Sequence, residues 1–470
     1  MTPRHRSPAA VAGRGAEEFG RNSLNVIVGR IVLAATVFAT SLITARWLGP
    51  GGRGEYSVAL LVASVVAIVF DLFSSSSVYF SARADFPRPR ILANTVALAL
   101  LSGTAAFLIC LGLLPVHGSL FGDVPSGYLV IALAAVPAGL VISDVSGIMR
   151  SVGDFFGYNA ALIAQAAVPL VLLAVVLIGL GGGAGAAVAA STVGTAIVSL
   201  GAVARCRRLV GGIEWQPDPT FARRAASYGL RAQPGTLLAF LGYRIDVLLV
   251  NGYLNAAAAG FYSVALATAE RVQTIGEAAG TVLYPHIAAE TVEERRARLT
   301  PIVARTVLWM TVVLAVALFT VAHWLVVLLY SNQFEPAIRP TEILVLSMIP
   351  SAVQRVLSAD LSGRGLPILN TYVAAVSLTA NVVLNVLLIP RYGTSGAAWS
   401  SVVSYSVAGI LTGALYVRVS GNSVAGVLLP HPDDLVLLRR VAGSLVRPFS
   451  ARGRPLDPAD LFARDFGDAA

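Results

Sequence analysis

The feature that most constrains this chain is a series of long apolar runs, separated by short connections rich in Gly, Pro, Ser and Asp. About 20 apolar residues in a helix cross a hydrocarbon core of about 30 Å, and a helix satisfies its own backbone hydrogen bonds there. A composition of 56% hydrophobic and 13% charged residues does not suit a soluble domain. The pattern predicts an all-α polytopic membrane protein with twelve transmembrane helices, at residues 22–46, 56–82, 91–114, 126–149, 157–180, 184–204, 227–254, 260–288, 302–330, 341–358, 368–390 and 395–418.

The orientation of these spans is predicted from the arginines in the connections. Connections 2–3, 4–5, 6–7, 8–9 and 10–11 carry 3, 1, 5, 3 and 1 Arg, a total of 13, whereas the other six connections carry four. Basic residues accumulate on the cytoplasmic side of membrane proteins. Both termini are therefore expected in the cytoplasm, and the net charge of +9 is explained by topology rather than by nucleic-acid binding.

A seven-residue phrase occurs twice in the chain. Residues 54–60 read GEYSVAL and residues 260–266 read GFYSVAL, 206 positions later, with six of the seven residues identical. A second repeated motif, Gly-Ala-Ala, lies at 185–187 and at 396–398, with an offset of 211. Coincidence between low-complexity helices is the alternative, but two matches at similar offsets favour duplication. We expect two pseudo-twofold-related six-helix halves, 22–204 and 227–418, around a central cleft.

The segments outside the two halves are predicted as tails and a linker. Residues 1–21 form an N-terminal tail, residues 205–226 a cytoplasmic linker and residues 419–470 a C-terminal tail. Apolar positions within 433–446 share one helical face, which predicts an amphipathic helix on the cytoplasmic leaflet. The first apolar run is too long for a cleaved signal peptide, so it is interpreted as a spanning helix.

Several function classes lack the residues that they need. All 34 basic residues are Arg, so the chain cannot supply the lysine of a Walker site or of a Schiff-base enzyme. The five histidines have no metal spacing. The GPGGRG stretch at 49–54 joins two spans, whereas a dinucleotide site follows a strand. No nucleophile–base constellation stands out, so we expect neither an enzyme nor a metal or cofactor site.

Ionisable and amide side chains inside the spans are the candidate site residues. Arg244 and Asp246 in span 7 and Glu270 and Arg271 in span 8 fall near one depth by helical rise. Such residues usually face protein or water rather than lipid. The functional interpretation is a polar cavity; the alternative is a set of structural pairs, Arg244 with Glu270 and Asp246 with Arg271. Further candidates within spans are Arg30, which has snorkelling as its alternative, and Asp71, Glu277, Asn381 and Asn385, whereas Arg46 and Arg53 are expected as outer-interface anchors.

Four stretches at helix boundaries carry a family resemblance. The chain resembles the oligosaccharide flippases of bacterial polysaccharide synthesis, in the multidrug/oligosaccharidyl-lipid/polysaccharide exporter superfamily. The resemblance covers residues from about 20 to about 420 and does not indicate the substrate. The stretches are RWLGPGGRGEY at 46–56, RID at 244–246 with GFY at 260–262, LYP at 283–285, and NVLLIPRYG at 385–393 with GAA at 396–398.

The resemblance implies translocation of a polyprenyl-pyrophosphate-linked oligosaccharide across the bacterial cytoplasmic membrane, by alternating access. It implies that Arg30, Arg244 and Arg271 hold the pyrophosphate, and arginine suits this task because its planar fork binds phosphate oxygens in a bidentate manner. Expected partners are membrane lipids and, beside the lipid-linked glycan, glycosyltransferases or a polysaccharide polymerase.

Two other functions stay open at this point. The same superfamily contains cation-coupled multidrug exporters, in which Asp71, Asp246, Glu270 and Glu277 would carry ions or protons. The other alternative is an envelope scaffold that transports nothing. The mixture of arginines and carboxylates in the spans favours the flippase, because a pocket for cationic drugs should be acidic and aromatic.

Overall fold

The computed structural model describes residues 8–83, 86–114, 122–290 and 293–429, and these residues form helices without a strand. The all-α architecture predicted from the apolar runs is therefore confirmed. The predicted amphipathic helix at 433–446 and the rest of the C-terminal tail beyond residue 429 lie outside the described residues.

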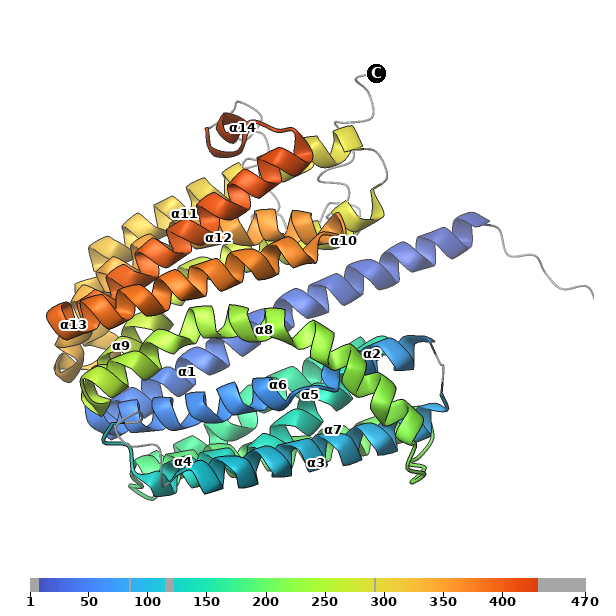
Figure 1. The fold of residues 1–470 in the computed structure, drawn as a ribbon, viewed down its shortest axis with the longest axis horizontal. Coiled ribbons are helices and arrows are strands. Elements are labelled where there is room, and N and C mark those ends of the chain that lie inside the picture. The colour runs from blue at the N-terminus through green and yellow to red at the C-terminus, as the bar shows by residue number, and fades with distance from the viewer. Residues whose placement is uncertain (1–7, 84–85, 115–121, 291–292, 430–470) are drawn as a thin grey trace, which may run out of the picture.

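The helices form two groups that lie beside each other, with α1, α8 and α9 between them (Figure 1). The first group contains α1 (Pro8–Phe70), α2 (Ser74–Arg83), α3 (Arg88–Leu113), α4 (Ser126–Leu133), α5 (Val136–Ser151), α6 (Phe155–Ala174), η3 (Val175–Gly179) and α7 (Ala184–Val210). The second group contains α8 (Pro219–Tyr253), α9 (Ala256–Ala269), η4 (Glu270–Gln273), α10 (Thr274–Ala289), α11 (Glu293–Tyr330), η5 (Asn332–Ala337), α12 (Ile338–Gly363), α13 (Pro367–Ser420) and α14 (Val424–Leu428).

Nine helices in the described part of the chain are long and apolar enough to cross a membrane. Two of them, α1 with 63 residues and α13 with 54, each contain one glycine with non-helical backbone angles, Gly49 at φ 66° and Gly393 at φ 58°. Positive φ suits glycine because it has no Cβ. Each long helix therefore combines two of the predicted spans, and the exact count of twelve stays a prediction.

The two copies of the repeated phrase pack against each other where α1 meets α9. A Cβ atom on Gly54 would lie 1.6 Å from the carbonyl oxygen of Ala256, and one on Gly260 would lie 2.0 Å from that of Pro50. The Ser57 hydroxyl donates to that of Ser263 at 3.3 Å. Small residues allow such close approach of membrane helices. Each copy of the repeated sequence therefore supplies one side of this helix contact.

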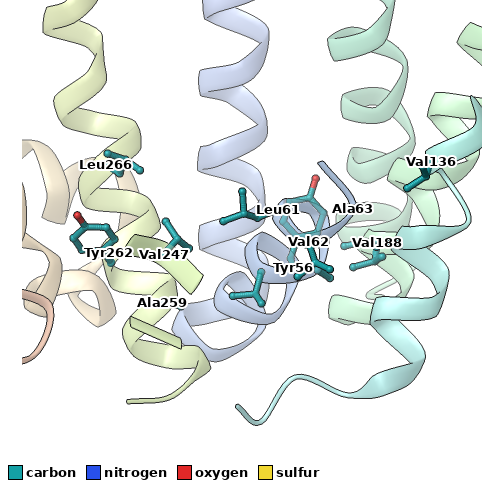
Figure 2. Packing of buried hydrophobic residues seen from close by; sticks show 14 of the residues in the cluster. Tyr56, Leu61, Val62, Ala63, Val136, Val188, Val247, Ala259, Tyr262 and Leu266 are labelled. Atoms are coloured by element: carbon teal, nitrogen blue, oxygen red, sulfur yellow. The ribbon is translucent and has the colours of Figure 1, made fainter. Parts of the chain in front are cut away.

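The tyrosine of each copy makes the same contact within its own half. The Tyr56 hydroxyl lies 3.0 Å from that of Ser191, and the Tyr262 hydroxyl lies 3.2 Å from that of Ser401. Figure 2 shows both tyrosines on separate helices of one buried cluster. The second tyrosine follows the first by 206 residues and the second serine follows the first by 210, as expected for two related halves.

Four predicted spans are broken where the sequence analysis expected continuous α-helices. Span 126–149 consists of α4 and α5, and span 157–180 consists of α6 and the π-helical η3. Span 56–82 is interrupted between α1 and α2, where the Asp71 carboxylate accepts a hydrogen bond from the backbone N–H of Ser74 at 3.2 Å. Span 260–288 changes from α9 to the 3-10 turn η4 before α10 begins. Broken helices in transporters expose backbone groups where they line a cavity. The continuous-helix expectation was wrong because apolar periodicity does not report such local breaks.

The segments outside the two groups differ in part from the predicted boundaries. Helix α1 begins at Pro8, inside the segment 1–21 that was expected to be a tail. The linker expected at 205–226 is shorter in the structure, since α7 continues to Val210 and α8 begins at Pro219. The connection is held against α3, where Arg90 pairs with Glu214 at 3.2 Å and the Asn94 side chain accepts from the backbone N–H of Asp218 at 3.0 Å.

Candidate functional site

A cavity of about 820 Å³ lies between the two groups of helices. Its walls come from α1, α4, α5, α6 and α7 on one side and from α8, α9 and η4 on the other. Most of the wall is apolar, as is usual for ligand sites, with a few polar groups placed within it. The charged side chains in the wall are Arg53, Asp71, Arg244, Glu270 and Arg271.

Arg244 and Glu270 form a two-point ion pair in this cavity. Nη1 of Arg244 lies 2.9 Å from Oε1 of Glu270, and Nη2 lies 3.2 Å from Oε2. The pair connects α8 with the 3-10 turn η4, where the broken span presents Glu270. The Arg244 side chain stays 35% exposed, so its guanidinium is within reach of a ligand. One of the two structural pairs considered from the sequence is thus present, and it also lines the cavity.

Arg271 lies in the cavity wall beside this pair. Its Nε donates to the carbonyl oxygen of Ala267 at 3.1 Å, and its Nη1 donates to the carbonyl oxygen of Ala34 at 3.5 Å. Ala34 belongs to α1, so the side chain reaches from the second group of helices to the first. Its hydrogen bonds in the described structure go to backbone carbonyls, and therefore its positive charge is not neutralised by them.

Arg53 was expected at the outer interface, but the structure places it in the cavity wall at 8% exposure. Its Nη1 donates to the Thr44 hydroxyl at 2.6 Å, and its Nη2 donates to the Ser41 hydroxyl at 3.4 Å. The expectation was wrong because α1 resumes immediately after Gly49, so that residue 53 already lies inside the next helical segment. Helix resumption after the Gly-Pro turn is the signal that could have identified it, since proline suits a first helical turn.

Asp246, a predicted site residue, lies outside the cavity wall and is 1% exposed. It accepts hydrogen bonds from the Tyr262 hydroxyl at 2.5 Å and from the Ser401 hydroxyl at 2.9 Å. These contacts connect α8, α9 and α13. The predicted pairing of Asp246 with Arg271 is not what these contacts show; the carboxylate instead holds three helices together.

Asn381, Asn385 and Glu277 also lie away from the cavity. Asn381 donates to the Ser404 hydroxyl at 3.1 Å, which connects the two segments of α13, and Asn385 donates to the Asn381 carbonyl at 2.9 Å within the first segment. Glu277 pairs with Arg355 at 3.4 Å, between α10 and α12. Arg30 belongs to α1, but its side chain is outside the described residues.

A second, smaller cavity of about 340 Å³ lies between α8, α12 and α13. Its polar wall residues are neutral and include Tyr243, Gln354, Asn370 and Tyr405. The two cavities therefore differ in chemistry: charged groups gather in the larger one and hydroxyl and amide groups in the smaller one. The sequence analysis identified Asn370 as polar within a span but did not separate the two sites.

Comparison with known proteins identifies both the fold and the family. The profile of a family described as "Polysaccharide biosynthesis protein" matches residues 43–339, more than half of the chain. No curated protein matches this chain. Lipid II flippase MurJ in an inward closed conformation is similar in structure, with a TM-score of 0.70 and 12% identity over 90% of this chain and 92% of that one.

Two transporters of the MOP superfamily are also similar. An inward-facing multidrug resistance MATE family transporter has a TM-score of 0.66 at 16% identity, covering 83% of this chain and 94% of that one. A transporter from Pyrococcus furiosus has a TM-score of 0.55 at 16% identity, covering 86% of this chain and 96% of that one. It is described as having a binding pocket of reverse polarity, which suggests a different function.

These neighbours are transporters and flippases, and they share the paired-half architecture described above. The expected family resemblance and the expected helical, multi-pass membrane architecture are thereby confirmed. The chain belongs to the polysaccharide biosynthesis protein family and has the fold of the MOP superfamily transporters.

Proposed function

We propose that this protein is a flippase that moves a polyprenyl-pyrophosphate-linked oligosaccharide across the cytoplasmic membrane. The observation that carries the proposal is the gathering of Arg53, Arg244 and Arg271 in one cavity between the halves. A pyrophosphate group needs cationic, hydrogen-bonding partners when it leaves water, and arginine provides both. Glycosyltransferases that assemble the glycan and a polymerase that consumes it are the proposed partners, with both termini of the chain in the cytoplasm.

Arg244 is the proposed first ligand of the pyrophosphate. Glu270 contacts both sides of its guanidinium fork, at 2.9 and 3.2 Å. A phosphate presents oxygens in a similar geometry and can replace the carboxylate. Exchange of one anion for another avoids leaving an arginine unpaired inside the protein, which would be costly.

Arg271 is the proposed second ligand, because its hydrogen bonds to carbonyl oxygens leave its charge available. Its contact with Ala34 reaches α1, so ligand binding at Arg271 acts on the boundary between the halves. Arg30 precedes Ala34 by one helical turn on α1 and is proposed as a third cation near this boundary. In this proposal Asp246, Asn381 and Asn385 hold the helices that position the ligands, and Glu277 does so through Arg355.

Alternating access follows from the same geometry. The halves meet at Gly54 and Gly260, where two helices approach backbone to backbone. Rocking of the halves about this contact opens the cavity first to one side and then to the other. In this proposal the small residues form the pivot, and the charged residues of the cavity wall bind the substrate.

A cation-coupled multidrug exporter is the second candidate, favoured by the structural similarity to a MATE family transporter. Asp71 and Glu270 would then bind the cation. The three arginines in the same wall oppose this interpretation, since they repel a cationic drug. A scaffold function, the remaining alternative, has no need for a charged cavity between the halves.

The test compares Arg244→Ala, Arg244→Lys and the double variant Arg244→Ala with Glu270→Gln in a strain that depends on this gene for its surface glycan. Arg244→Lys keeps the positive charge but loses the bidentate guanidinium, so we expect the transport rate to fall at least about tenfold. Arg244→Ala should lower the rate further. Each tenfold change corresponds to about 1.4 kcal/mol of binding free energy. Accumulated lipid-linked glycan is measured by mass spectrometry beside the abundance of the protein in membranes.

Arg339→Ala is the matched control, because Arg339 is 70% exposed and pairs only with Glu342 of its own helix among the contacts described. It should leave transport unchanged. A purely structural Arg244–Glu270 pair predicts lower abundance for Arg244→Ala and recovery in the double variant. Normal abundance with normal transport in Arg244→Ala would contradict the assignment of Arg244 as a pyrophosphate ligand.

A further inference from the structure

The smaller cavity, of about 340 Å³ between α8, α12 and α13, has no part in the proposed pyrophosphate site. Its volume falls in the range of small-molecule sites, roughly 300–1,000 Å³. Among the described residues that form its wall, none is Asp, Glu, His or Arg. A pocket for an ion or a charged drug needs an opposite charge in its wall, because a charge that leaves water has to be paired. This wall therefore suits an uncharged ligand.

The wall of the smaller cavity is nevertheless polar. It contains serine, threonine and tyrosine hydroxyls and the side-chain amides of Gln354 and Asn370. The Gln354 amide, the Thr371 hydroxyl and the hydroxyls of Tyr243 and Tyr405 make no hydrogen bond within the described residues. Hydroxyl and amide groups can both donate and accept hydrogen bonds. A ligand that carries several hydroxyl groups can pair with them in either direction.

Other polar groups of this wall are already fixed by the protein. Nδ2 of Asn370 donates to the carbonyl oxygen of Ser358 and to the hydroxyl of Ser362, each at 2.9 Å. The Ser377 hydroxyl donates to the carbonyl oxygen of Ser404 at 2.9 Å. These bonds connect α12 with α13 and join the two segments of α13. The frame of the cavity is thus held in place, which lowers the cost of ordering it around a ligand.

Two tyrosines form an aromatic corner in the wall. The ring centres of Tyr243 and Tyr405 lie 5.2 Å apart, with the ring planes at 59°. The guanidinium of Arg355 lies 4.9 Å from the ring centre of Tyr243 and pairs with Glu277 at 3.4 Å, so this ring is held from α12. Tyrosine combines an apolar ring with a polar end. A sugar ring matches this arrangement, because its C–H groups pack on an aromatic face while its hydroxyls reach polar groups.

The two cavities lie on two faces of α8. Tyr243 lines the smaller cavity, and the next residue, Arg244, lines the larger one. Successive residues of a helix point in directions roughly 100° apart. We propose that the smaller cavity is a carbohydrate subsite, which binds an uncharged sugar ring of the lipid-linked glycan whose pyrophosphate is held at Arg244. This inference rests on the proposed function and adds to it a site for the sugar.

The polyprenyl chain is the competing occupant, since Leu238 and Val373 also belong to the wall. An apolar chain would cover the free Gln354 amide and the free Thr371 hydroxyl without offering them a hydrogen bond. Such burial of unpaired polar groups is unfavourable. The polar wall therefore favours the sugar over the chain, and the experiment separates the two.

The test follows thermal unfolding of the full-length protein in nanodiscs, free of sugar-based detergent, as a free sugar is added. The probes are glucose, galactose and N-acetylglucosamine, and glycerol corrects for the general stabilisation that polyols cause. A ligand that binds the folded state raises the unfolding temperature as its concentration increases. We expect at least one of the three sugars to stabilise the wild type more than glycerol does at equal concentration.

Two variants change the cavity wall without removing a hydrogen bond of the described structure. No atom lies within 4 Å of a Cβ placed on Gly242, so Gly242→Leu should fold and extend into the cavity. Gln354→Leu removes the free amide. Each should weaken the apparent affinity for the stabilising sugar at least about tenfold. Gly201→Leu in α7 is the matched control, because it also has free space, lies outside both cavities and should respond as the wild type does.

The same variants in cells identify the source of the sugar. The Gly242→Leu strain should accumulate lipid-linked glycan, measured by mass spectrometry. If its glycan were normal although the purified variant no longer responded to sugar, the site would bind a free sugar and the assignment to the lipid-linked glycan would be wrong.

Three results in nanodiscs would overturn the proposal. They are a wild type that no sugar stabilises more than glycerol does, an equal sugar response in the wild type and both wall variants, and stabilisation by sugar-free polyprenyl phosphate that Gly242→Leu alone loses. The last result would assign the cavity to the lipid chain. Failure of the flippase proposal is a separate result, because it appears as normal glycan in the Arg244→Ala strain and leaves the sugar response in nanodiscs unchanged.

Discussion

The two copies of the repeated phrase are alike in packing and unlike in charge. Tyr56 contacts Ser191 in the first half, and Tyr262 contacts Ser401 in the second, by hydroxyl pairs of 3.0 and 3.2 Å. Beside the first tyrosine lies Arg53, with its guanidinium 5.9 Å from the ring centre. Beside the second lies a carboxylate, Asp246, which accepts the hydrogen bond of Tyr262.

This difference separates what holds the halves together from what the halves contain. The glycines, serines and tyrosines are repeated because helix packing requires them in both halves. The ionisable neighbours differ because one half exposes its cation to the cavity, whereas the other seals its anion between three helices. Duplication thus supplies a symmetric frame, and the ionisable residue beside each tyrosine differs between the halves.

The largest effect is expected at the close helix contact to which both copies of the repeated phrase contribute. Gly54→Ala and Gly260→Ala should both abolish most folded protein, because each new Cβ would lie 1.6 or 2.0 Å from a backbone oxygen. The cost should exceed the roughly 1–3 kcal/mol of ordinary overpacking, since backbone atoms cannot rotate away. Membrane abundance and thermal unfolding of the purified variants measure the effect.

Gly51→Ala is the control for this pair, since nothing lies within 4 Å of a Cβ placed there. It should fold normally. If Gly54→Ala lowered abundance while Gly260→Ala left it unchanged, the idea of a shared, symmetric contact would have to be abandoned.

The next largest effect is expected from a comparison of two ion pairs, one in each half, at connections that are both predicted to be cytoplasmic. Arg364, 5% exposed in its side chain, is bonded to the buried Asp360 and to Glu293, whereas Arg205 is 44% exposed and pairs with Asp154. Arg364→Ala leaves Asp360 buried without its cation, so we expect a loss of about 3 kcal/mol. Arg205→Ala should cost at most about 1 kcal/mol, as exposed pairs do.

Chemical or thermal unfolding in detergent distinguishes the two ion pairs. The double variant of Arg364→Ala with Asp360→Asn should recover part of the loss, since it also removes the buried charge. Equal losses for Arg364→Ala and Arg205→Ala would mean that burial does not set the difference between these connections.

A smaller effect is expected at the two tyrosines. Tyr262→Phe removes the donor to the buried Asp246 and should cost about 2 kcal/mol, because a hydrogen bond to a charged group is lost. Tyr56→Phe removes a bond between two hydroxyls and should cost about 1 kcal/mol. The comparison is measured by the free energy of unfolding of the two variants. The reverse order would show that the carboxylate does not distinguish the halves.

The sequence predicted the membrane class, the two halves and the proximity of Arg244 to Glu270, because apolar periodicity and helical rise act over long stretches. It did not predict that Arg53 lies in the cavity, since that depends on how sharply the chain turns at Gly49. It also did not separate Asp246 from the cavity two residues after Arg244. Helical spacing places Arg244 and Asp246 on different faces of α8. Only the packing of Asp246 against Tyr262 and Ser401 decides which of these faces is buried.

The smallest expected effect concerns pH at the exposed ion pair of the first half. Hydrogen bonds from Arg205 lower the pKa of Asp154 below its ordinary value, with further help from the backbone N–H of Gly157. Nε and Nη2 of Arg205 each lie 2.8 Å from the carboxylate oxygens. A group whose pKa is lower in the folded state stabilises the fold above its unfolded pKa of about 3.9, and this stability is lost as pH falls through the folded pKa.

Wild type should therefore unfold at a higher temperature than Asp154→Asn near neutral pH, and the difference should shrink as the pH falls below about 4. Arg205→Ala in place of Asp154→Asn removes the same pair and should abolish this dependence. A difference that grows on acidification would reverse the sign and exclude the Asp154–Arg205 pair as its source.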